Sequence, residues 1–170
     1  MARRSVRQYK DQPVEREKLE LIAKCGVNAP NGLNRQPWEI RVVDSPDFIN
    51  GITKVFLDSD STQANKLQFK NMFRNAPAVI FIASPRDGSG QVDCGLLGEN
   101  IVLAAQSLGL GSCCLGGPIR FMTTNENARP YLEQLDFSDG YQLLYAIGIG
   151  YPDETPDAKP RDMSKVKFID

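Results

Sequence analysis

The run Ala78-Val-Ile-Phe-Ile-Ala83 constrains the fold more than any other part of the chain. An unbroken apolar run of this length is typical of a strand that is covered on both faces of a sheet. A second apolar stretch, Val92–Leu108, follows the helical period and predicts a helix that is buried on most sides. The chain of 170 residues is long enough for one core of this kind. Helices packed on a sheet are therefore expected.

Periodicity and turn residues predict the remaining elements. They are helices over Gln12–Gly26, Asp47–Phe56, 63–75 and Asn125–Leu135, and strands over Trp38–Val43, Ser112–Leu115 and Tyr141–Ile149. This mixed order fits an α+β or α/β chain with about four strands. We expect one domain over residues 1–170. Its prolines indicate that 152–170 is an extended tail, which we expect to lie on a partner subunit.

The chain contains no histidine. Ser-His-Asp or Cys-His catalysis and a histidine-ligated metal site are therefore excluded. Lys plus Arg number 20 and Asp plus Glu number 21, so the formal net charge is −1. This balance argues against bulk nucleic-acid binding, which needs a basic excess. Either the chain is not an enzyme, or a group other than imidazole carries its chemistry.

The four cysteines, Cys25, Cys94, Cys113 and Cys114, form no Cys-x-x-Cys pair. Neither a zinc ribbon nor a thioredoxin motif is supported, and we expect all four to be buried as small hydrophobic residues. Free thiols fit a cytoplasmic location. We find no signal peptide and no apolar run of the roughly 18–20 residues that span a bilayer, so no membrane partner is expected.

Four segments carry residues that could build a site. Arg3–Arg7 holds three guanidinium groups and a hydroxyl, a set that suits a phosphate. The loop Ala29–Trp38 gathers amides that suit a heteroaromatic ring with carbonyls. The glycines of Gly109–Gly117 would let a flat ligand or another chain approach the backbone. Lys159–Arg161 adds a basic pair on the tail.

Each segment also fits a plainer role. These roles are a solvated basic terminus, a capping loop, a set of tight turns and an exposed pair of charges. The glycine-rich segment is not a dinucleotide-binding fingerprint, because a helix precedes it and no long helix is expected after Gly117.

Taken in order along the chain, these segments resemble the nitroreductase-like flavoproteins, at the small end of that family. The resemblance rests on Arg-Arg-Ser-x-Arg at 3–7, Ala-Pro-x-x-x-Asn-Arg-Gln-Pro-Trp at 29–38, Asn75-Ala-Pro77, Gly109-Leu-Gly-Ser-Cys113, Gly148-Ile-Gly-Tyr-Pro152 and Lys159-Pro-Arg161. It spans Arg3 to Arg161. It implies an α+β fold with a central mixed sheet of about four to five strands flanked by helices, in a domain-entwined homodimer.

The resemblance also implies FMN bound at the homodimer interface and contacted by both chains. It assigns Arg3, Arg4, Ser5 and Arg7 to the phosphate, ribityl and pyrimidine side of the cofactor, with Lys159 and Arg161 closing on the phosphate. The other subunit would contribute Pro30, Asn31 and Asn34. Gly116 and Gly117 would lie beside the isoalloxazine ring, and Asn71 is a further candidate. The flavin would carry the chemistry, so no catalytic side chain and no metal are expected. Residues 57–75 are the one obvious lid.

The function implied is an oxidoreductase that uses NADH or NADPH for ping-pong reduction of nitroaromatics, quinones or similar small acceptors. Such chemistry needs no imidazole base, since protons can come from water or substrate. One alternative is an FMN-binding redox module that a ferredoxin-like protein reduces, with no nicotinamide site. Another is an interaction domain without a cofactor, which would use the basic arm Arg3–Lys10.

Overall fold

Strand β2 (Ala78–Pro85) lies inside a four-stranded sheet, as its apolar run predicts. The computed structural model describes residues 3–59 and 70–169. The other strands are β1 (Glu39–Val43), β3 (Gly111–Leu115) and β4 (Tyr141–Gly150), and the order across the sheet is β1-β2-β4-β3. Strands β2 and β4 are therefore central, and the shorter strands β1 and β3 form the edges.

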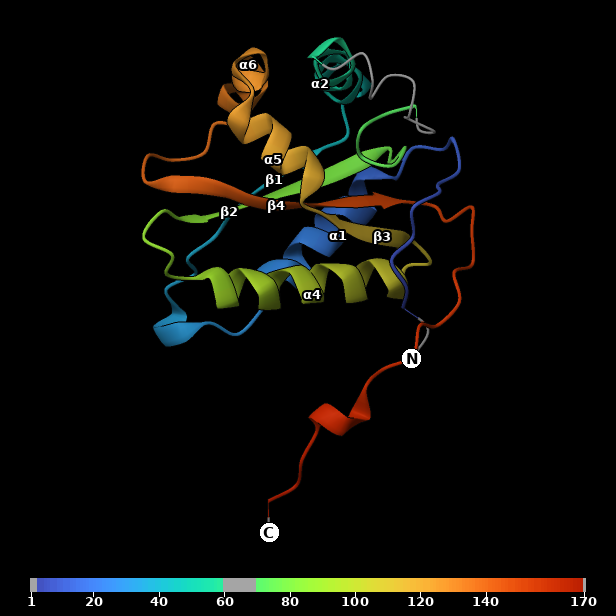
Figure 1. Cartoon of the computed structure of the whole chain (residues 1–170), viewed down its shortest axis with the longest axis vertical. Coiled ribbons are helices and arrows are strands. Elements are labelled where there is room, and N and C mark those ends of the chain that lie inside the picture. The colour runs from blue at the N-terminus through green and yellow to red at the C-terminus, as the bar shows by residue number, and fades with distance from the viewer. Residues whose placement is uncertain (1–2, 60–69, 170) are drawn as a thin grey trace.

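Alternation along β2 divides the interior into two hydrophobic clusters, one on each face of the sheet. Ile80 and Ile82 belong to one cluster, and Val79 and Phe81 belong to the other. Helices α1 (Arg16–Val27) and α4 (Gln91–Ser107) cover the first face. Helices α2 (Pro46–Ser59), α5 (Gly117–Thr124) and α6 (Arg129–Gln134) lie over the second face (Figure 1).

Every ladder between the described strands is antiparallel. The resemblance implies a mixed sheet. Among the described residues, the one parallel pairing is an isolated bridge between Ser5 and Ser112 at the β3 edge. Strand β4 separates β2 from β3, and antiparallel pairing on both sides of β4 makes β2 and β3 run the same way. Helix α4 supplies the crossover that this relationship requires.

Helix α1 begins later than the predicted Gln12–Gly26 helix. Its first residue is Arg16, and Glu15 is an extended N-cap residue. The preceding residues are held in extended backbone, because Tyr9 forms a bridge with Pro152 and the Lys10 amide donates to the Tyr151 carbonyl at 2.9 Å. Pro13 therefore lies in the non-helical segment between these contacts and the N-cap residue Glu15.

A short helix, α5, begins at Gly117, and its eight residues agree with the expectation that no long helix follows there. Its buried Ile119 and Met122 stand three residues apart, and Pro118 lies in its first turn. Two other helix predictions need correction. The predicted Asn125–Leu135 helix is divided into a 3-10 turn and α6. Of the predicted helix 63–75, residues 63–69 lie outside the described part, and 70–75 form a turn.

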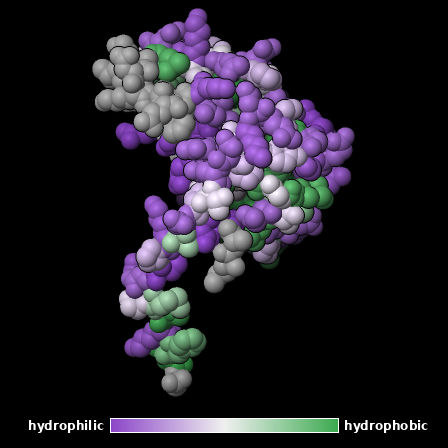
Figure 2. Space-filling model, turned by 90° about the vertical axis from the view of Figure 1, so that its right-hand side faces the viewer, coloured by the Kyte–Doolittle hydropathy of each residue, from purple (hydrophilic) through white to green (hydrophobic). Residues whose placement is uncertain are grey.

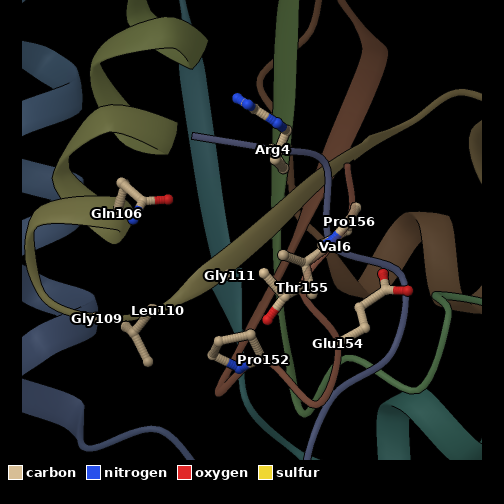
Figure 3. Close-up of a pocket in the computed structure, with 10 residues that line it drawn as sticks. All are labelled: Arg4, Val6, Gln106, Gly109, Leu110, Gly111, Pro152, Glu154, Thr155 and Pro156. Atoms are coloured by element: carbon tan, nitrogen blue, oxygen red, sulfur yellow. The ribbon is translucent and has the colours of Figure 1, made fainter. Parts of the chain in front are cut away.

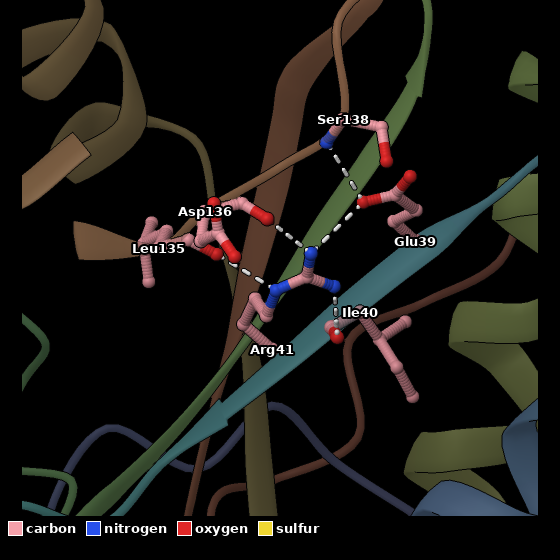
Figure 4. A network of polar contacts seen from close by, with 6 residues as sticks. All are labelled: Glu39, Ile40, Arg41, Leu135, Asp136 and Ser138. Atoms are coloured by element: carbon pink, nitrogen blue, oxygen red, sulfur yellow. Dashed lines mark hydrogen bonds and ion pairs between the residues drawn. The ribbon is translucent and has the colours of Figure 1, made fainter. Parts of the chain in front are cut away.

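Arg41 ties edge strand β1 to the segment that follows α6 (Figure 4). Its Nε donates to the Leu135 carbonyl at 2.7 Å, and its guanidinium also donates to the Asp136 carbonyl. Glu39 accepts from Arg41 at 3.0 Å and from the Ser138 amide at 3.1 Å. The contacts close one edge of the sheet with charge-assisted hydrogen bonds.

Helix α4 is apolar on both sides, but the single chain covers only one of them. Leu97, Ile101 and Ala105 are fully buried against the sheet. On the outer side, Val92 is 78% exposed and Leu96 is 42% exposed. The prediction of a helix buried on most sides therefore does not hold within one chain.

The first residues after Tyr151 remain on the body of the molecule, but the later part of the tail leaves it, and hydrophobic side chains gather toward its end (Figure 2). These exposed side chains are Met163, Val166, Phe168 and Ile169. The tail is thus extended, as predicted, and within one chain its apolar residues cover nothing.

The cysteines are all free, but they are not all buried. Cys94 and Cys113 are buried, Cys25 is half-buried and Cys114 is exposed. Alternation along β3 explains the difference between the two neighbouring thiols, because successive side chains point to opposite faces. Among the described residues, no helix is long and apolar enough to cross a membrane.

Candidate cofactor site

The N-terminal arm and the first residues after β4 lie side by side near the β3 edge (Figure 1). The N-terminal arm, residues 3–10, is held to the sheet by the Val6 amide, which donates to the Ser112 carbonyl at 2.9 Å. Gly111 permits this approach, because a Cβ there would lie 2.8 Å from Val6. The first residues of the tail pair with the other side of the arm, where the Asp153 amide donates to the Gln8 carbonyl at 3.0 Å.

Beside this pairing lies a cavity of about 700 Å³ with four cations among its eight lining residues, which we call the cationic cavity. Its lining residues are Arg3 and Arg4 of the arm, Glu99, Leu103 and Gln106 of α4, and Ala158, Lys159 and Arg161 of the tail. Four of the predicted phosphate-binding residues thus come together from opposite ends of the sequence. Four positive side chains facing one carboxylate suit a multiply charged anion.

Glu99 is the carboxylate in this cavity, and its Oε1 lies 3.8 Å from Nε of Arg3. Both side chains are substantially exposed, so the pair contributes little to stability. Glu99, Leu103 and Gln106 were missed as lining residues. Their spacing of four and then three residues along an otherwise apolar helix places them on one face, and this pattern was the available signal.

Ser5 and Arg7 lie on the arm but do not line the cationic cavity. Ser5 forms the bridge with Ser112, and its carbonyl accepts from the Arg7 guanidinium at 3.1 Å. Arg4 and Val6 line a neighbouring cavity that Ser5 and Arg7 do not line. Of the predicted Arg-Arg-Ser-x-Arg grip, Arg3 and Arg4 therefore line the cationic cavity, and Ser5 and Arg7 do not.

Gly116 and Gly117 form the junction between β3 and α5. A Cβ at either position would meet no other atom within 4 Å, and Gly116 has an ordinary φ of −102°. Neither the backbone conformation nor packing within the chain demands glycine here. The absence of side chains leaves the backbone open to a flat group from outside.

The loop of Pro30, Asn31 and Asn34 lies away from the cationic cavity. Asn31 Oδ1 accepts from the Gln36 amide at 2.8 Å and shapes the loop. The same loop packs Pro37 against Gly90 at the start of α4, whereas Gln106 lines the cavity near the end of that helix. A helix of 17 residues is about 25 Å long. Within one chain, the two predicted halves of the cofactor site therefore lie far apart.

Asn71 closes the turn that precedes β2. Its Oδ1 accepts from the amides of Phe73 and Asn75, each at 3.0 Å. Asn71 borders a different cavity, of about 530 Å³, together with Tyr9 and Asp44. The structure thus gives this residue a turn-forming role and does not bring it to the cationic cavity.

The vicinal cysteines are not set up as nucleophiles. Burial raises the pKa of the Cys113 thiol, against the opposing charge of Arg7. Partial desolvation also raises the pKa of the Cys114 thiol, although Arg3 opposes this shift. Reactive thiolates need a lowered pKa, so neither residue has the environment of a catalytic cysteine.

The fold and the motifs define a known class of protein. The model of the Nitroreductase family matches residues 1–151. This chain belongs to the nitroreductase family, which confirms the resemblance and the α+β fold.

Individual relatives cover nearly the whole chain. A protein of Archaeoglobus fulgidus whose name includes "NAD(P)H nitroreductase" is 31% identical to this chain, and the alignment covers 91% of this chain and 84% of the relative. The NADPH-flavin oxidoreductase of Vibrio harveyi is 26% identical to this chain, and the alignment covers 95% of this chain and 67% of the relative. A Desulfitobacterium hafniense nitroreductase with bound FMN superposes with a TM-score of 0.85 at 26% identity, covering 99% and 95% of the two chains.

Proposed function

We propose that this chain is an FMN-dependent oxidoreductase that uses NADH or NADPH to reduce nitroaromatics, quinones or similar small acceptors in a ping-pong cycle. The observation that carries the proposal is the cationic cavity, where Arg3 and Arg4 meet Lys159 and Arg161. The names of its relatives support the same chemistry, since they include an NADPH-flavin oxidoreductase and FMN-bound nitroreductases.

The donor set fits the phosphate of FMN. Arginine and lysine donate charge-assisted hydrogen bonds, and a phosphate carries close to two negative charges that several such donors can share. The resemblance assigns Ser5 and Arg7, together with Arg3 and Arg4, to the phosphate, ribityl and pyrimidine side of FMN. Gly116 and Gly117 would leave room for the ring beside the end of β3.

When bound, the flavin would supply the hydride and electron transfer between the two substrates. The chain's own residues bind and orient it. Positive side chains neutralise the phosphate, and the open backbone at Gly116 and Gly117 gives the ring access without steric conflict. The chain has no histidine, and none of these binding roles requires one.

The complete site would be formed in a homodimer. The loop with Pro30, Asn31 and Asn34 lies at the far end of α4 from the cationic cavity, so a partner subunit would have to supply it. The outer side of α4 exposes Val92 and Leu96, and the tail exposes further apolar side chains at 163–169. Burial of such apolar surface between two copies would favour the dimer.

The test is to purify the full chain, add FMN, and measure its absorbance spectrum and its oxidation of NADH and NADPH. We expect a yellow protein that oxidises at least one nicotinamide faster when a nitroaromatic or quinone is present. A protein that takes up no FMN would contradict the proposal. A yellow protein that is inert to both nicotinamides but accepts electrons from ferredoxin would instead support the alternative redox module.

A further inference from the structure

The tail is paired with the N-terminal arm before it reaches the cationic cavity. The pairs run in antiparallel order and join Lys10 with Tyr151, Tyr9 with Pro152, Gln8 with Asp153, and Arg7 with Glu154. The first three pairs are formed by backbone groups, so they do not depend on which side chains these residues carry. The fourth differs, because the Glu154 carboxylate accepts the hydrogen bond of the Arg7 amide.

Glu154 stands beside the phosphate-binding residues without being one of them. It lines a smaller cavity of about 280 Å³ with Arg4 and Gln106, both of which also line the cationic cavity. Figure 3 shows Gln106 of α4 and Leu110, which precedes β3, across this cavity from Pro152 and Thr155 of the tail. The two cavities therefore adjoin, and the tail forms a wall of each.

We propose that Glu154 is a positioning residue for the phosphate: by holding the tail on the Arg7 amide, it keeps Lys159 and Arg161 opposite Arg3 and Arg4. This inference rests on the proposed function. Only four residues separate Glu154 from Lys159, and an extended chain advances at most about 3.6 Å per residue. A fixed Glu154 thus keeps the Cα atoms of Lys159 and Arg161 within about 18 Å and about 25 Å of its own, so less ordering of the tail is left for the ligand to impose.

Simple electrostatics predicts the opposite effect of removing Glu154. A carboxylate near an anion-binding cavity repels the anion, so its loss alone would tighten phosphate binding. Loss of a positioning contact would weaken it. The direction of the change in FMN affinity therefore distinguishes the two roles.

The experiment compares FMN with riboflavin, which has the same ring and ribityl chain but no phosphate. We would measure the Kd of both flavins for the wild-type dimer and for E154A, E154Q and D153A. We expect E154A to bind FMN about 10-fold more weakly, which corresponds to one charge-assisted hydrogen bond, and riboflavin with unchanged affinity. E154Q keeps an acceptor oxygen and should lose less. D153A removes an exposed neighbouring charge but keeps its backbone pair, so it should match wild type.

A second arm tests whether Glu154 acts through the tail cations. In a K159A/R161A background, E154A should cause no further loss of FMN affinity. Should E154A fail to fold, E154D provides the test, since its shorter side chain keeps the charge but reaches less far, and it should weaken FMN binding selectively.

Unchanged or tighter FMN binding by E154A would overturn the inference, and so would an equal loss of FMN and riboflavin. A wild-type protein that binds neither flavin would instead overturn the proposed function itself.

Discussion

The hydroxyl of Tyr145 lies 2.6 Å from the carbonyl oxygen of Cys94, and a Cβ at Gly98 would stand 2.0 Å from the same hydroxyl. Tyr145 projects from β4, and both other residues belong to α4. Burial raises the pKa of Tyr145, so the phenol remains a protonated donor. One tyrosine thus sets the distance between the central sheet and the helix whose outer side lines the cationic cavity.

We expect Gly98→Ala to destabilise the fold by about 1–3 kcal/mol, because either Tyr145 or α4 must move. The cost should be smaller in a Tyr145→Phe background, where the atom in closest conflict is gone. Urea unfolding of the four proteins in this double-mutant cycle measures the coupling. Equal costs in both backgrounds would show that the helix does not depend on this contact. Gly95→Ala is the matched control, since a Cβ there meets no atom within 4 Å.

Arg161→Ala should weaken FMN binding by about 1.5–3 kcal/mol, the contribution of a hydrogen bond to a charged group. It should also reduce the salt dependence of FMN affinity, because one fewer cation would meet the phosphate. Flavin fluorescence titrations at several salt concentrations provide the measurement. Lys167→Ala removes a cation from the same tail outside the cavity lining and should leave FMN affinity as it is. If the two variants behave alike, the tail does not act on the phosphate.

We expect the wild-type chain to sediment as a dimer and Leu96→Glu to shift it toward monomer. The new charge would be placed on the exposed apolar side of α4, where a partner would have to desolvate it. Lys54→Glu also introduces a glutamate, with a charge change of two units, on α2 on the opposite face of the sheet, and should remain dimeric. Analytical ultracentrifugation decides between these outcomes. A Leu96→Glu dimer as tight as wild type would place the interface elsewhere.

The Glu39–Arg41 contacts predict a loss of stability in acid. Burial raises the pKa of Glu39, but the hydrogen bonds of Ser138 and the charge of Arg41 outweigh it, so the folded pKa lies below 4.5. A lowered folded pKa means that ionised Glu39 stabilises the fold above about pH 4.5, and this contribution disappears as the pH falls through the folded pKa.

The free energy of unfolding should therefore fall less steeply below pH 5 in Glu39→Gln than in wild type. Urea denaturation at a series of pH values is the measurement. Glu20→Gln, at an exposed position on α1, controls for the loss of one carboxylate. Parallel pH profiles for wild type and Glu39→Gln would exclude a role for these contacts in acid stability.

The strands were predictable from local pattern, because β2 and β4 bury both faces and therefore stand out as apolar runs. The start of α1 was not predictable, since contacts with Tyr151 and Pro152, far away in sequence, hold residues 9 and 10 extended. The exposure of Cys114 beside buried Cys113 depends on which face of an edge strand is covered, and no local pattern records that.

The motifs identified the two pairs of cations in the cavity, Arg3 with Arg4 and Lys159 with Arg161. That the two pairs lie close together depends on the antiparallel pairing of the N-terminal arm with the tail. Glu154, which we propose positions the tail, was missed for a different reason from Glu99, Leu103 and Gln106. A single glutamate in a proline-rich segment has no periodicity or spacing that marks it, and its contact becomes visible only when Arg7 lies beside it.

Strand β2 belongs to both hydrophobic clusters, since Ile80 and Ile82 enter one and Val79 and Phe81 the other. Neither cluster can open to water without uncovering this strand, so the two halves of the interior share one unfolding event. The backbone amides of Val79–Ile82 should consequently exchange their hydrogens with solvent only when the whole domain unfolds. A single apolar run thus makes the two sides of the sheet one cooperative unit.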